Sequence, residues 1–413
     1  MSDPRRSILL GVFERALAAV DGRECTRKAA ASLPESADWR LFAIGKAASA
    51  MTLGALDLLG PRVIEALVVS RDGHFSPELE QAAGVTCLAT GHPIPDERSL
   101  AAGAELLRRL EKLEREQKVL FLISGGASSL IEALPEGVTL EDLRKVNEWG
   151  LSIGIDIVGL NRIRKSLSLI KGGRLLQHLS GHDTHALLIS DVPGDDPGVI
   201  GSGMLGAPEP AIGPGRMPPW VQNLMRRAAP AIIPEVLKIE RRVIARLDDA
   251  LQAARREGEN RGLEVVLHAQ HFTGDAQHLA VGFAHEMILS PAALNVWGGE
   301  STVQLPESPG RGGRNQHLAL AAALLLAGHD DLAMLVAGTD GTDGSGSDAG
   351  ALVDGSTLDR GTIAGFDAEG CLARRDAGSF LEASGDLVTT GPTGTNVGDL
   401  ALGLRLAGAS AER

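Results

Sequence analysis

The segment Val119–Ser129, VLFLISGGASS, carries the strongest structural signal in the chain. Its five leading apolar residues form an unbroken run of strand length, which is typical of a strand buried on both faces in a parallel sheet covered by helices. Gly125 and Gly126 then allow a tight turn that presents backbone N–H groups to a small anion. Three hydroxyl side chains lie in the same loop: Ser124, Ser128 and Ser129. We interpret the loop as a ligand site, with a plain strand-to-helix turn as the alternative.

The same order of apolar run, glycine and polar residues recurs along the chain. It is found in LFAIGKAAS (41–49), LLISDVPGDDP (187–197) and MLVAGTDGTDG (334–344). In open α/β sheets, ligands bind beyond the carboxyl ends of the strands. These strand endings therefore predict one composite site or two facing sites.

Length and composition limit the class of protein. A chain of 413 residues exceeds what one hydrophobic core usually organises, so we expect two domains. The net charge of −13 and the aromatic content of 3% argue against nucleic acid as a partner, because such partners need basic surfaces and exposed rings. Three widely spaced cysteines favour reduced thiols in a cytoplasmic protein. We expect no membrane association, because no signal peptide or apolar segment of membrane-spanning length is visible.

Lys46 follows a predicted strand, Leu41–Ile44, and precedes a predicted helix over 47–59. A cation at a helix N-terminus opposes the helix dipole, so an anion bound between Lys46 and the backbone N–H groups would explain its position. A solvated lysine is the alternative. The segment is not a P-loop, because the pattern GxxxxGK[ST] is absent.

The segment Asn161–Arg174, NRIRKSLSLIKGGR, concentrates basic residues in an acidic chain. Charge runs usually form a solvated face. Apolar residues at helical spacing supply a buried face here, so part of the basic face could instead line a phosphate or carboxylate site. Arg164 and Lys171 are the candidates for that role.

Carboxylates follow several of the predicted strands. Asp191 lies two residues after the strand 185–189, and Glu300 lies three residues after the strand 294–297. Asp340 and Asp343 lie in a glycine-rich loop whose spacing differs from that of an EF-hand. Oxygen-rich loops of this kind suit Mg²⁺.

The second half of the chain contains its own cation at a helix start. GRGGRNQ (310–316) opens a long Ala/Leu helix, so that Arg314 follows glycines as Lys46 does. The loop TTGPTGTNVGDL (389–400) offers hydroxyls, an amide side chain and backbone N–H groups before an expected final helix. We expect both segments to bind ligand.

Several boundaries are predicted from the same patterns. Residues 5–31 read as one amphipathic helix, and 243–257 as another. A proline-rich segment over 207–219 precedes the expected domain boundary. That boundary gives domains 1–236 and 237–413.

The expected parts are those of phosphoryl transfer, which depends on positioning and charge neutralisation. A reductase using NAD(P)H would need a dinucleotide site. GSGMLG (201–206) matches GxGxxG, but no strand of normal length precedes it, and we interpret it as a chance match. A non-catalytic phosphosugar-binding protein is a further alternative that would not need metal carboxylates.

The motifs, in their order, closely resemble those of the MOFRL-type D-glycerate 2-kinases, a family also labelled hydroxypyruvate reductase in some tartrate-utilisation operons. The motifs are AIGKAA, GHPIPD, LISGGASS, LNRIRKSLSLIKGGR, SDVPGDD, GGESTV, GGRNQ, AGTDGTDG and TGPTGTNVGDL. The resemblance implies an α/β fold with an N-terminal Rossmann-like parallel-sheet domain and a C-terminal MOFRL α/β domain. It also implies ATP and Mg²⁺ as cosubstrates and 2-phospho-D-glycerate as product. A monomer and a homodimer both remain open.

By that resemblance, the family's essential lysine and arginine fall on Lys46 and Arg314. Our hypothesis is that these two cations hold the substrate carboxylate and the transferring phosphoryl group, while Asp191 orients or deprotonates the 2-hydroxyl. The expected metal-binding carboxylates are Glu300, Asp340 and Asp343. The expected substrate- and nucleotide-binding residues are Gly45, Ser124, Gly125, Gly126, Ser128, Arg164, Lys171, Gly313, Asn315, Thr393 and Asn396.

Overall fold

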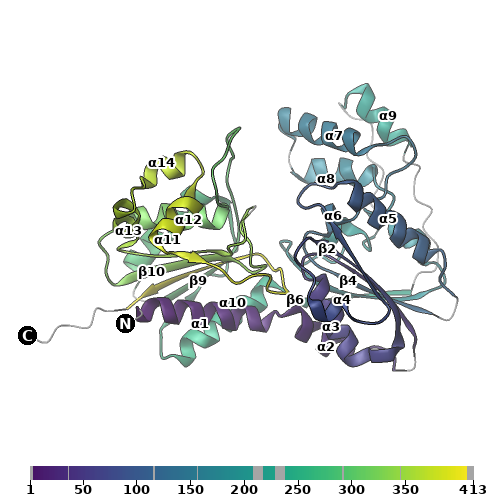
Figure 1. Cartoon of the computed structure of the whole chain (residues 1–413), viewed down its shortest axis with the longest axis horizontal. Coiled ribbons are helices and arrows are strands. Elements are labelled where there is room, and N and C mark those ends of the chain that lie inside the picture. Colours follow the sequence, from purple (N-terminus) through teal and green to yellow (C-terminus); the bar gives the residue numbers. More distant parts are fainter. Residues whose placement is uncertain are drawn as a thin grey trace, which may run out of the picture. The chain divides into compact units, whose positions relative to one another are not determined.

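The structure is a computed structural model that describes residues 3–35, 37–114, 117–155, 157–207, 217–227, 238–290, 293–344 and 346–406. The chain forms two compact units (Figure 1). Gly22–Ala245 contain a parallel sheet, and we call them the parallel-sheet unit. Met1–Asp21 and Arg246–Arg413 contain a mixed sheet, and we call them the mixed-sheet unit.

The parallel-sheet unit has six strands in the order β3-β2-β1-β4-β5-β6, and every neighbouring pair is parallel. The strands are β1 (Trp39–Ile44), β2 (Val63–Arg71), β3 (Val85–Thr90), β4 (Lys118–Ile123), β5 (Asp183–Ile189) and β6 (Lys238–Ala245). This is the strand order of the doubly wound dinucleotide-binding folds. The predicted Rossmann-like parallel sheet is confirmed.

Helices connect these strands and cover the sheet. They are α2 (Gly22–Ala30), α3 (Ala48–Leu59), α4 (Pro77–Glu80), α5 (Glu97–Leu110), α6 (Ala127–Leu130), α7 (Leu140–Ser152), α8 (Ile157–Ser166) and α9 (Pro219–Arg227). The core between strands and helices is built from apolar residues such as Phe42, Phe121 and Leu106. A second cluster joins α7, α8 and α9 through Val146, Ile163 and Val221.

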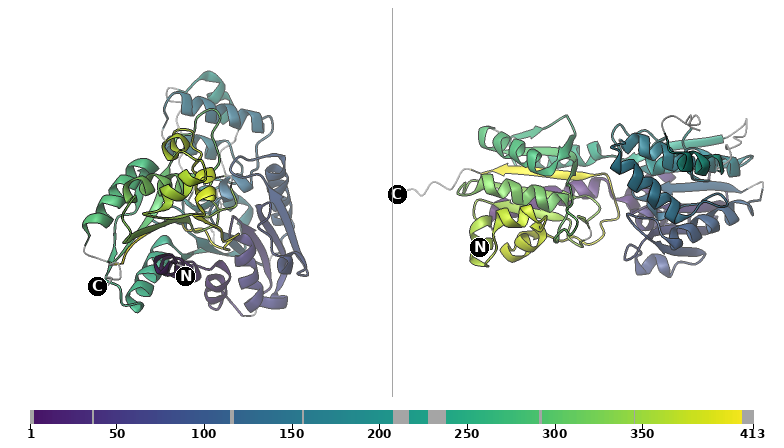
Figure 2. Two further views of the ribbon diagram at one scale, coloured as in Figure 1. Left: turned by 60° about the vertical axis from the view of Figure 1, so that its left-hand side comes forward. Right: turned by 90° about the horizontal axis from the view of Figure 1, so that it is seen from above.

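The mixed-sheet unit has seven strands, ordered β12-β11-β10-β13-β9-β7, with β8 paired to β9. The strands are β7 (Val265–Leu267), β8 (Phe272–Asp275), β9 (Leu294–Thr302), β10 (Leu332–Gly338), β11 (Gly350–Asp354), β12 (Leu387–Val388) and β13 (Asp399–Arg405). β7 and β8 run parallel to β9, and the other pairs are antiparallel. β13, drawn in yellow in Figure 2, lies between β9 and β10.

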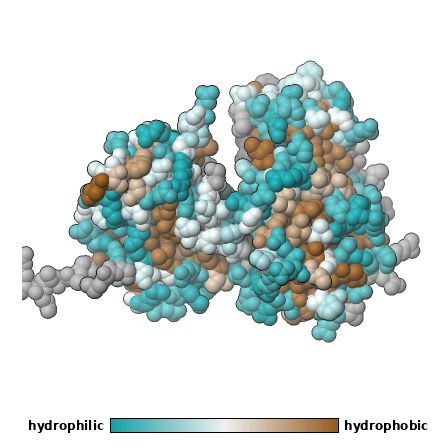
Figure 3. Space-filling model, viewed as in Figure 1, coloured by the Kyte–Doolittle hydropathy of each residue, from teal (hydrophilic) through white to brown (hydrophobic). Residues whose placement is uncertain are grey.

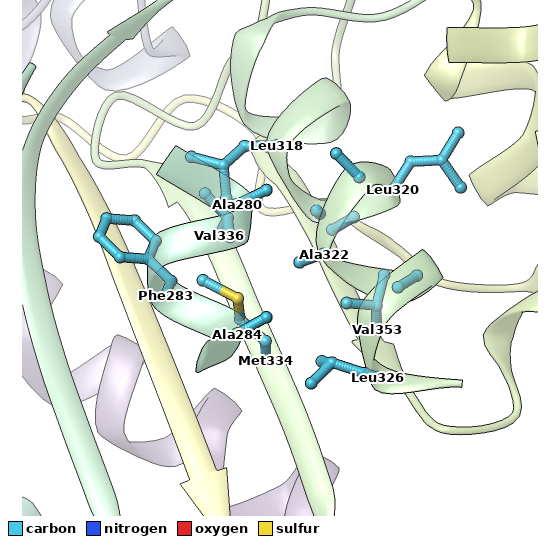
Figure 4. Close-up of a cluster of buried hydrophobic side chains, with 14 of the residues drawn as sticks. Ala280, Phe283, Ala284, Leu318, Leu320, Ala322, Leu326, Met334, Val336 and Val353 are labelled. Atoms are coloured by element: carbon cyan, nitrogen blue, oxygen red, sulfur yellow. The ribbon is translucent and has the colours of Figure 1, made fainter. Parts of the chain in front are cut away.

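Helices cover both faces of the mixed sheet. They are α1 (Pro4–Ala19), α10 (Leu247–Asn260), α11 (Ala276–Leu289), α12 (Arg314–Leu326), α13 (Thr357–Ile363), α14 (Ala368–Ala373) and α15 (Ala377–Ser384). α1 and α10 pack together on one face, and α11 and α12 lie on the other (Figure 1). In Figure 4, Phe283 from α11, Leu318 from α12 and Val336 from β10 meet in the resulting core. α12 is apolar on nearly all sides because it is buried between the sheet and further helices.

The predicted single helix over 5–31 is wrong. The chain forms two helices instead, and α1 ends before Val20 while α2 begins at Gly22. The apolar residues of α1, including Val12 and Phe13, are buried in the mixed-sheet unit, whereas α2 packs on α3 of the parallel-sheet unit. One straight helix cannot bury its apolar residues in the cores of both units.

Two other sequence-based boundaries differ from the structure. Residues 243–245, predicted as the start of a helix, belong to β6, which completes the parallel sheet. The residues after 400, predicted as a helix, form the central strand β13. Most of the proline-rich segment and the expected boundary at 236/237 lie outside the described residues, and the two compact units divide at Ala245/Arg246.

The described part of the chain contains no helix long and apolar enough to cross a membrane. On the face drawn in Figure 3, hydrophobic residues are interspersed among hydrophilic ones. Such scattered apolar residues are normal on protein surfaces.

Candidate active site

The strand order of the parallel sheet reverses between β1 and β4, and ligands of such folds bind beyond the carboxyl ends of the strands at this point. β1 and β4 pair in register up to Ile44 opposite Ile123, so Gly45 and Ser124 leave the sheet at the same level. The backbone N–H of Lys46 donates to the carbonyl of Gly125 over 2.9 Å. The structure thus brings together the two loops that sequence patterns had singled out.

Close packing explains the glycine before Lys46. Gly45 has φ +135°, and a Cβ there would lie 2.1 Å from the hydroxyl oxygen of Ser124. That hydroxyl accepts the N–H of Ala47 over 3.0 Å, which ties the β1 loop to the β4 loop. Only glycine fits at this contact.

Two basic side chains, His92 and Lys46, lie close to Gly126, the residue before α6. It has φ +83°, and a Cβ there would lie 3.2 Å from both His92 Nε2 and Lys46 Cγ. His74 Nδ1 lies 3.2 Å from the carbonyl of Lys46 on another side. His74 and His92, which lie in the loops after β2 and β3, therefore flank the Lys46 loop.

A pocket of about 690 Å³ opens beside this loop. Its lining includes three basic residues of α8, Arg162, Arg164 and Lys165, and one carboxylate, Asp191. Cations therefore outnumber anions on the wall, which favours an anionic ligand. Of the predicted binding residues, Gly126, Ser128 and Arg164 line the pocket: the remaining lining residues are His92, Pro93, Ala127, Ser129, Asn161, Val192, Val199, Gly201 and Ser202.

A left-handed backbone turn, Gly201–Gly203, forms part of the pocket wall. All three of its residues have φ between +58° and +65°, including Ser202, which lacks the freedom of glycine. The Ser202 hydroxyl donates to the Ser128 hydroxyl over 2.6 Å. GSGMLG, which we interpreted as a chance dinucleotide motif, is thus a wall of the pocket. The pairing of two distant serines is not visible in sequence.

Lys171 does not line the pocket, although the sequence predicted that it binds substrate. Its side chain is 2% exposed, and its ammonium group forms an ion pair with Glu132. Burial lowers the pKa of Lys171, and Glu132 opposes that effect. Its direct contact with substrate is therefore not supported by the geometry.

In the mixed-sheet unit, Arg314 is the first residue of α12, as predicted. Its guanidinium donates to both oxygens of Asp399, over 2.6 and 3.0 Å, and lies 3.1 Å from Glu300. Burial would lower the pKa of Arg314, but the adjacent Asp399 raises it. Asp399 was missed in the sequence because its loop was read for hydroxyls and amides, and its 85-residue separation hides the pairing.

Asp343 has a capping role in place of the predicted metal role. Its two carboxylate oxygens accept the N–H groups of Asn315 and Gln316, over 3.1 and 2.7 Å, at the start of α12. The side chain is buried, and this burial raises its pKa to about 7, with repulsion from Asp399 adding to the effect. Carboxylates stabilise helix N-termini in this way.

The glycines before Arg314 are explained by packing. A Cβ on Gly313 would lie 2.2 Å from Asp343 Oδ1, and one on Gly310 would lie 2.4 Å from Asp376 Cβ. Asn315, a predicted ligand residue, is fully buried, and its amide has no hydrogen-bond partner within the described residues. Close packing therefore accounts for Gly313, whereas the predicted ligand role of Asn315 stays a prediction.

The other predicted residues of this unit surround the end of β10. Asp340 accepts the N–H of Thr342 over 2.9 Å, and the hydroxyl of Thr393 donates to the carbonyl of Thr339 over 2.5 Å. Asn396 is 8% exposed. Thr393 thus stabilises the loop, whereas nothing in these contacts tests a ligand role for Asn396.

The described residues contain no group of three or more His, Cys, Asp or Glu side chains that could hold a metal ion. Glu300 and Asp343 are engaged by Arg314 and by helix N–H groups. Mg²⁺ is commonly held by one or two carboxylates together with substrate phosphates. A magnesium ion carried mainly by a phosphate ligand fits this donor set better than a cage of protein carboxylates.

The fold is a doubly wound parallel sheet with a basic pocket at its carboxyl edge, together with a mixed-sheet unit in which a buried aspartate pairs with an arginine. These features define an α/β protein built to bind small anions. Residues 8–211 match a domain of unknown function (DUF4147), and residues 293–399 match the MOFRL family. A D-glycerate 2-kinase of Thermotoga maritima is 34% identical over 88% of this chain and 90% of its own length.

A crystal structure of a glycerate kinase from Thermotoga maritima matches with a TM-score of 0.83 and 30% identity, covering 98% of this chain and all of that one. A protein of Agrobacterium vitis that carries a hydroxypyruvate reductase name is 35% identical over 86% of this chain and 96% of its own. The chain belongs to the MOFRL-type glycerate 2-kinase family. This confirms the family and the fold class inferred from the motifs.

Proposed function

We propose that the protein transfers the γ-phosphoryl group of ATP to the 2-hydroxyl of D-glycerate. The hydroxyl oxygen forms the new bond to phosphorus, its proton is lost to a base, and ADP leaves. The names of the relatives support this activity. The observation that carries it in the structure is the basic pocket beside the Lys46 loop. Phosphoryl transfer requires such positioning and charge neutralisation more than covalent chemistry.

In the parallel-sheet unit, Lys46 and the cations of α8 neutralise charge on the anionic reactants. Lys46 follows the end of β1 and adjoins Gly126, so its side chain is directed by the two interlocked loops. Ser202 donates its hydroxyl proton to Ser128, which leaves the Ser128 hydroxyl as a donor on the same wall. Among the described residues of the pocket lining, Asp191 is the one carboxylate, and it is the proposed base that orients and deprotonates the 2-hydroxyl.

In the mixed-sheet unit, Arg314 is the proposed second cation of the reaction. The buried Asp399 binds it through two parallel hydrogen bonds and fixes its orientation, while Glu300 is 60% exposed. A carboxylate or phosphate oxygen of a reactant can replace Glu300 at the guanidinium without disturbing Asp399. Arg314 therefore keeps its orientation while exchanging one partner.

Mg²⁺ is part of the proposal. When bound, it would neutralise the phosphates of ATP and draw charge from the leaving group. Asp340 and Glu300 are the residues that would hold it, with phosphate oxygens and water completing the shell. Asp343 is left out because both of its oxygens cap α12.

A reductase would use the same sheet differently. Dinucleotide folds place a glycine-rich GxGxxG turn after the first strand, with the pyrophosphate at the following helix. Here β1 is followed by Gly45, Lys46 and Ala47, and the GxGxxG match at 201–206 lies in a turn before β6. No observation in the structure favours hydride transfer.

We further propose a cytoplasmic location with small-molecule substrates as partners, and both a monomer and a homodimer are compatible with it. Cys25, Cys87 and Cys371 are free thiols, which supports a reducing compartment.

The test is ADP release from ATP and Mg²⁺ on addition of D-glycerate, followed by phosphorus NMR of the product. The expected product carries phosphate on the 2-oxygen. Oxidation of NADH or NADPH by hydroxypyruvate, with no ADP formed from glycerate, would replace the kinase with the reductase.

A further inference from the structure

A buried ion pair, Glu132 and Lys171, interacts with a half-buried residue of the pocket wall, Arg164. The Glu132 carboxylate accepts hydrogen bonds from the Lys171 ammonium, from the Ser168 hydroxyl at 2.6 Å and from the N–H of Ala133 at 3.0 Å. Glu132 and Lys171 are each 2% exposed. Neither lines the pocket, and the reaction proposed above does not use either of them directly.

Arg164 belongs to the same electrostatic group but also lines the pocket. Burial lowers its pKa, and the charge of Glu132 partly opposes that effect. Its guanidinium donates to Asn161 Oδ1 over 3.3 Å, along the same helix. One buried carboxylate, Glu132, thus interacts with two cations: Lys171, which is buried and paired with it, and Arg164, which is half-buried. A partly desolvated cation is unfavourable unless an anion compensates its charge, and Glu132 is already engaged by Lys171.

The same group is joined to the rest of the pocket through the backbone. The Ser168 hydroxyl also accepts the N–H of Lys171 over 3.2 Å, which fixes the turn that follows. In that turn, Gly172 and Gly173 donate to the carbonyls of Ser202 and Gly203, over 3.1 and 2.7 Å. The ion pair therefore supports the left-handed turn whose serine faces the pocket.

The charge of the wall selects the kind of anion. A monocarboxylate is neutralised by one cation, whereas this wall presents Arg162, Arg164 and Lys165 together. Their number matches a polyphosphate chain, and guanidinium groups bind phosphate oxygens in pairs. A volume of about 690 Å³ also exceeds what a three-carbon acid fills.

We propose that the pocket accepts the phosphates of the nucleotide, and that Lys171 keeps Arg164 available to them by neutralising Glu132. The inference rests on the proposed kinase activity and assigns one of its substrates to this unit. Lys171 is a positioning residue here, because it acts through Arg164 and touches no reactant. Without its ammonium group, the Glu132 carboxylate competes with the phosphates for Arg164.

The test is calorimetric binding of a non-hydrolysable ATP analogue with Mg²⁺, and separately of D-glycerate, to the full chain. Arg164→Gln should lower the affinity for the analogue about tenfold, which is the equivalent of one charged hydrogen bond. Its affinity for D-glycerate should stay within about twofold of that of the unmodified protein. Lys171→Met should weaken the analogue by a similar factor. The double variant Glu132→Gln/Lys171→Met should recover binding to within about threefold of the unmodified protein, because Arg164 then has no competing carboxylate.

Lys118→Met is the matched control. Lys118 forms an ion pair with Asp183 at 2.6 Å, at the first residues of β4 and β5, at the opposite edge of the same sheet. It should leave binding of the analogue unchanged. An equal loss in this variant would show general destabilisation and overturn the inference.

Other results would also overturn it. Unchanged binding in Lys171→Met, or a double variant that stays as weak as the single one, excludes the positioning role. If Lys171→Met does not fold, Arg164→Gln still identifies the ligand of the pocket. A variant that loses affinity for D-glycerate but keeps its affinity for the analogue would assign the pocket to the acid. Binding is measured without turnover, so intact nucleotide binding with no transfer to glycerate would refute the proposed function alone.

Discussion

The buried carboxylate of Asp343 makes the stability of the mixed-sheet unit depend on pH in a direction unusual for an aspartate. Burial raises its pKa to about 7 from 3.8, outweighing the N–H groups of Asn315 and Gln316 that lower it. Between these values the folded state holds a proton that the unfolded state has lost. Stability therefore falls as pH rises from about 4 to about 7, and is level above that.

The size of the effect follows from the same two pKa values. A difference of one unit between the folded and unfolded pKa corresponds to about 1.4 kcal/mol of unfolding free energy. The loss of stability between about pH 4 and pH 7 is therefore about 4 kcal/mol. Between about pH 5.5 and 7.5, which most assays reach, the loss is about 2 kcal/mol. Asp343→Asn removes the titration while keeping one oxygen that accepts a helix N–H.

The assay is denaturant unfolding across this pH range, followed by tryptophan fluorescence, for the unmodified protein and the variant. The expected result is a difference in unfolding free energy that moves by about 2 kcal/mol in favour of Asp343→Asn as pH rises. Asp354→Asn is the control in the same unit. Burial would raise the pKa of Asp354, but hydrogen bonds from Arg360 and Ser356 lower it to about 2, so its titration lies below the window.

Parallel pH profiles for Asp343→Asn and the unmodified protein would refute this reasoning. They would mean that the N–H groups at the start of α12 outweigh burial and keep the carboxylate charged throughout. If instead the difference in unfolding free energy between Asp354→Asn and the unmodified protein changed with pH, a group other than Asp343 would contribute to the pH dependence.

Three further outcomes are expected. Arg314→Lys keeps the charge but loses the paired hydrogen bonds to Asp399, so kcat for ADP release should fall about a hundredfold, against less than about threefold for Arg311→Lys. Gly126→Ala should lower both activity and unfolding temperature, because the new Cβ would press against His92 and Lys46. Gly73 has a similar positive φ but no atom within 4 Å of a new Cβ, so Gly73→Ala should lower stability by about 1 kcal/mol without changing activity. Burial lowers the pKa of His317 to about 4, so its own contribution to stability is lost as pH falls from about 6.5 to 4; the difference in unfolding temperature between His317→Leu and the unmodified protein should therefore move in favour of His317→Leu over that range.

The parallel sheet and its ligand loops were predictable because local patterns and one topological rule decide them. Apolar runs of strand length locate β1 and β4, and the carboxyl ends of parallel strands lie at one edge. The register of Ile44 with Ile123 then brings Gly45 and Ser124 to the same level. No side-chain information is required for that step.

The partners of the charged residues were not predictable from the same patterns. Arg314 pairs with Asp399 across 85 residues, and Lys171 with Glu132 across 39. A basic residue on an amphipathic segment looks the same whether its head group meets a ligand or a buried carboxylate. Lys171 and Arg164 illustrate this, because they share one basic segment but only Arg164 lines the pocket.

The glycines before Arg314 show the same limit. A glycine run at a helix start predicts an anion-binding backbone, and it equally fits a chain that must pass close to other atoms. Here a Cβ on Gly313 would collide with Asp343, whose oxygens already occupy the N–H groups of α12. The helix start therefore binds a protein carboxylate, where the sequence pattern predicted a bound ligand.

The charge around Arg314 determines how it can act. One guanidinium faces Asp399 and Glu300, so this group as a whole carries no excess of positive charge with which to attract an anion. The two carboxylates differ in exposure, 2% for Asp399 and 60% for Glu300. Because a buried partner is costly to lose and an exposed one is nearly neutral, Asp399 stays in place and Glu300 exchanges. Arg314 can thus exchange its exposed partner for another anion while Asp399 keeps the guanidinium in place.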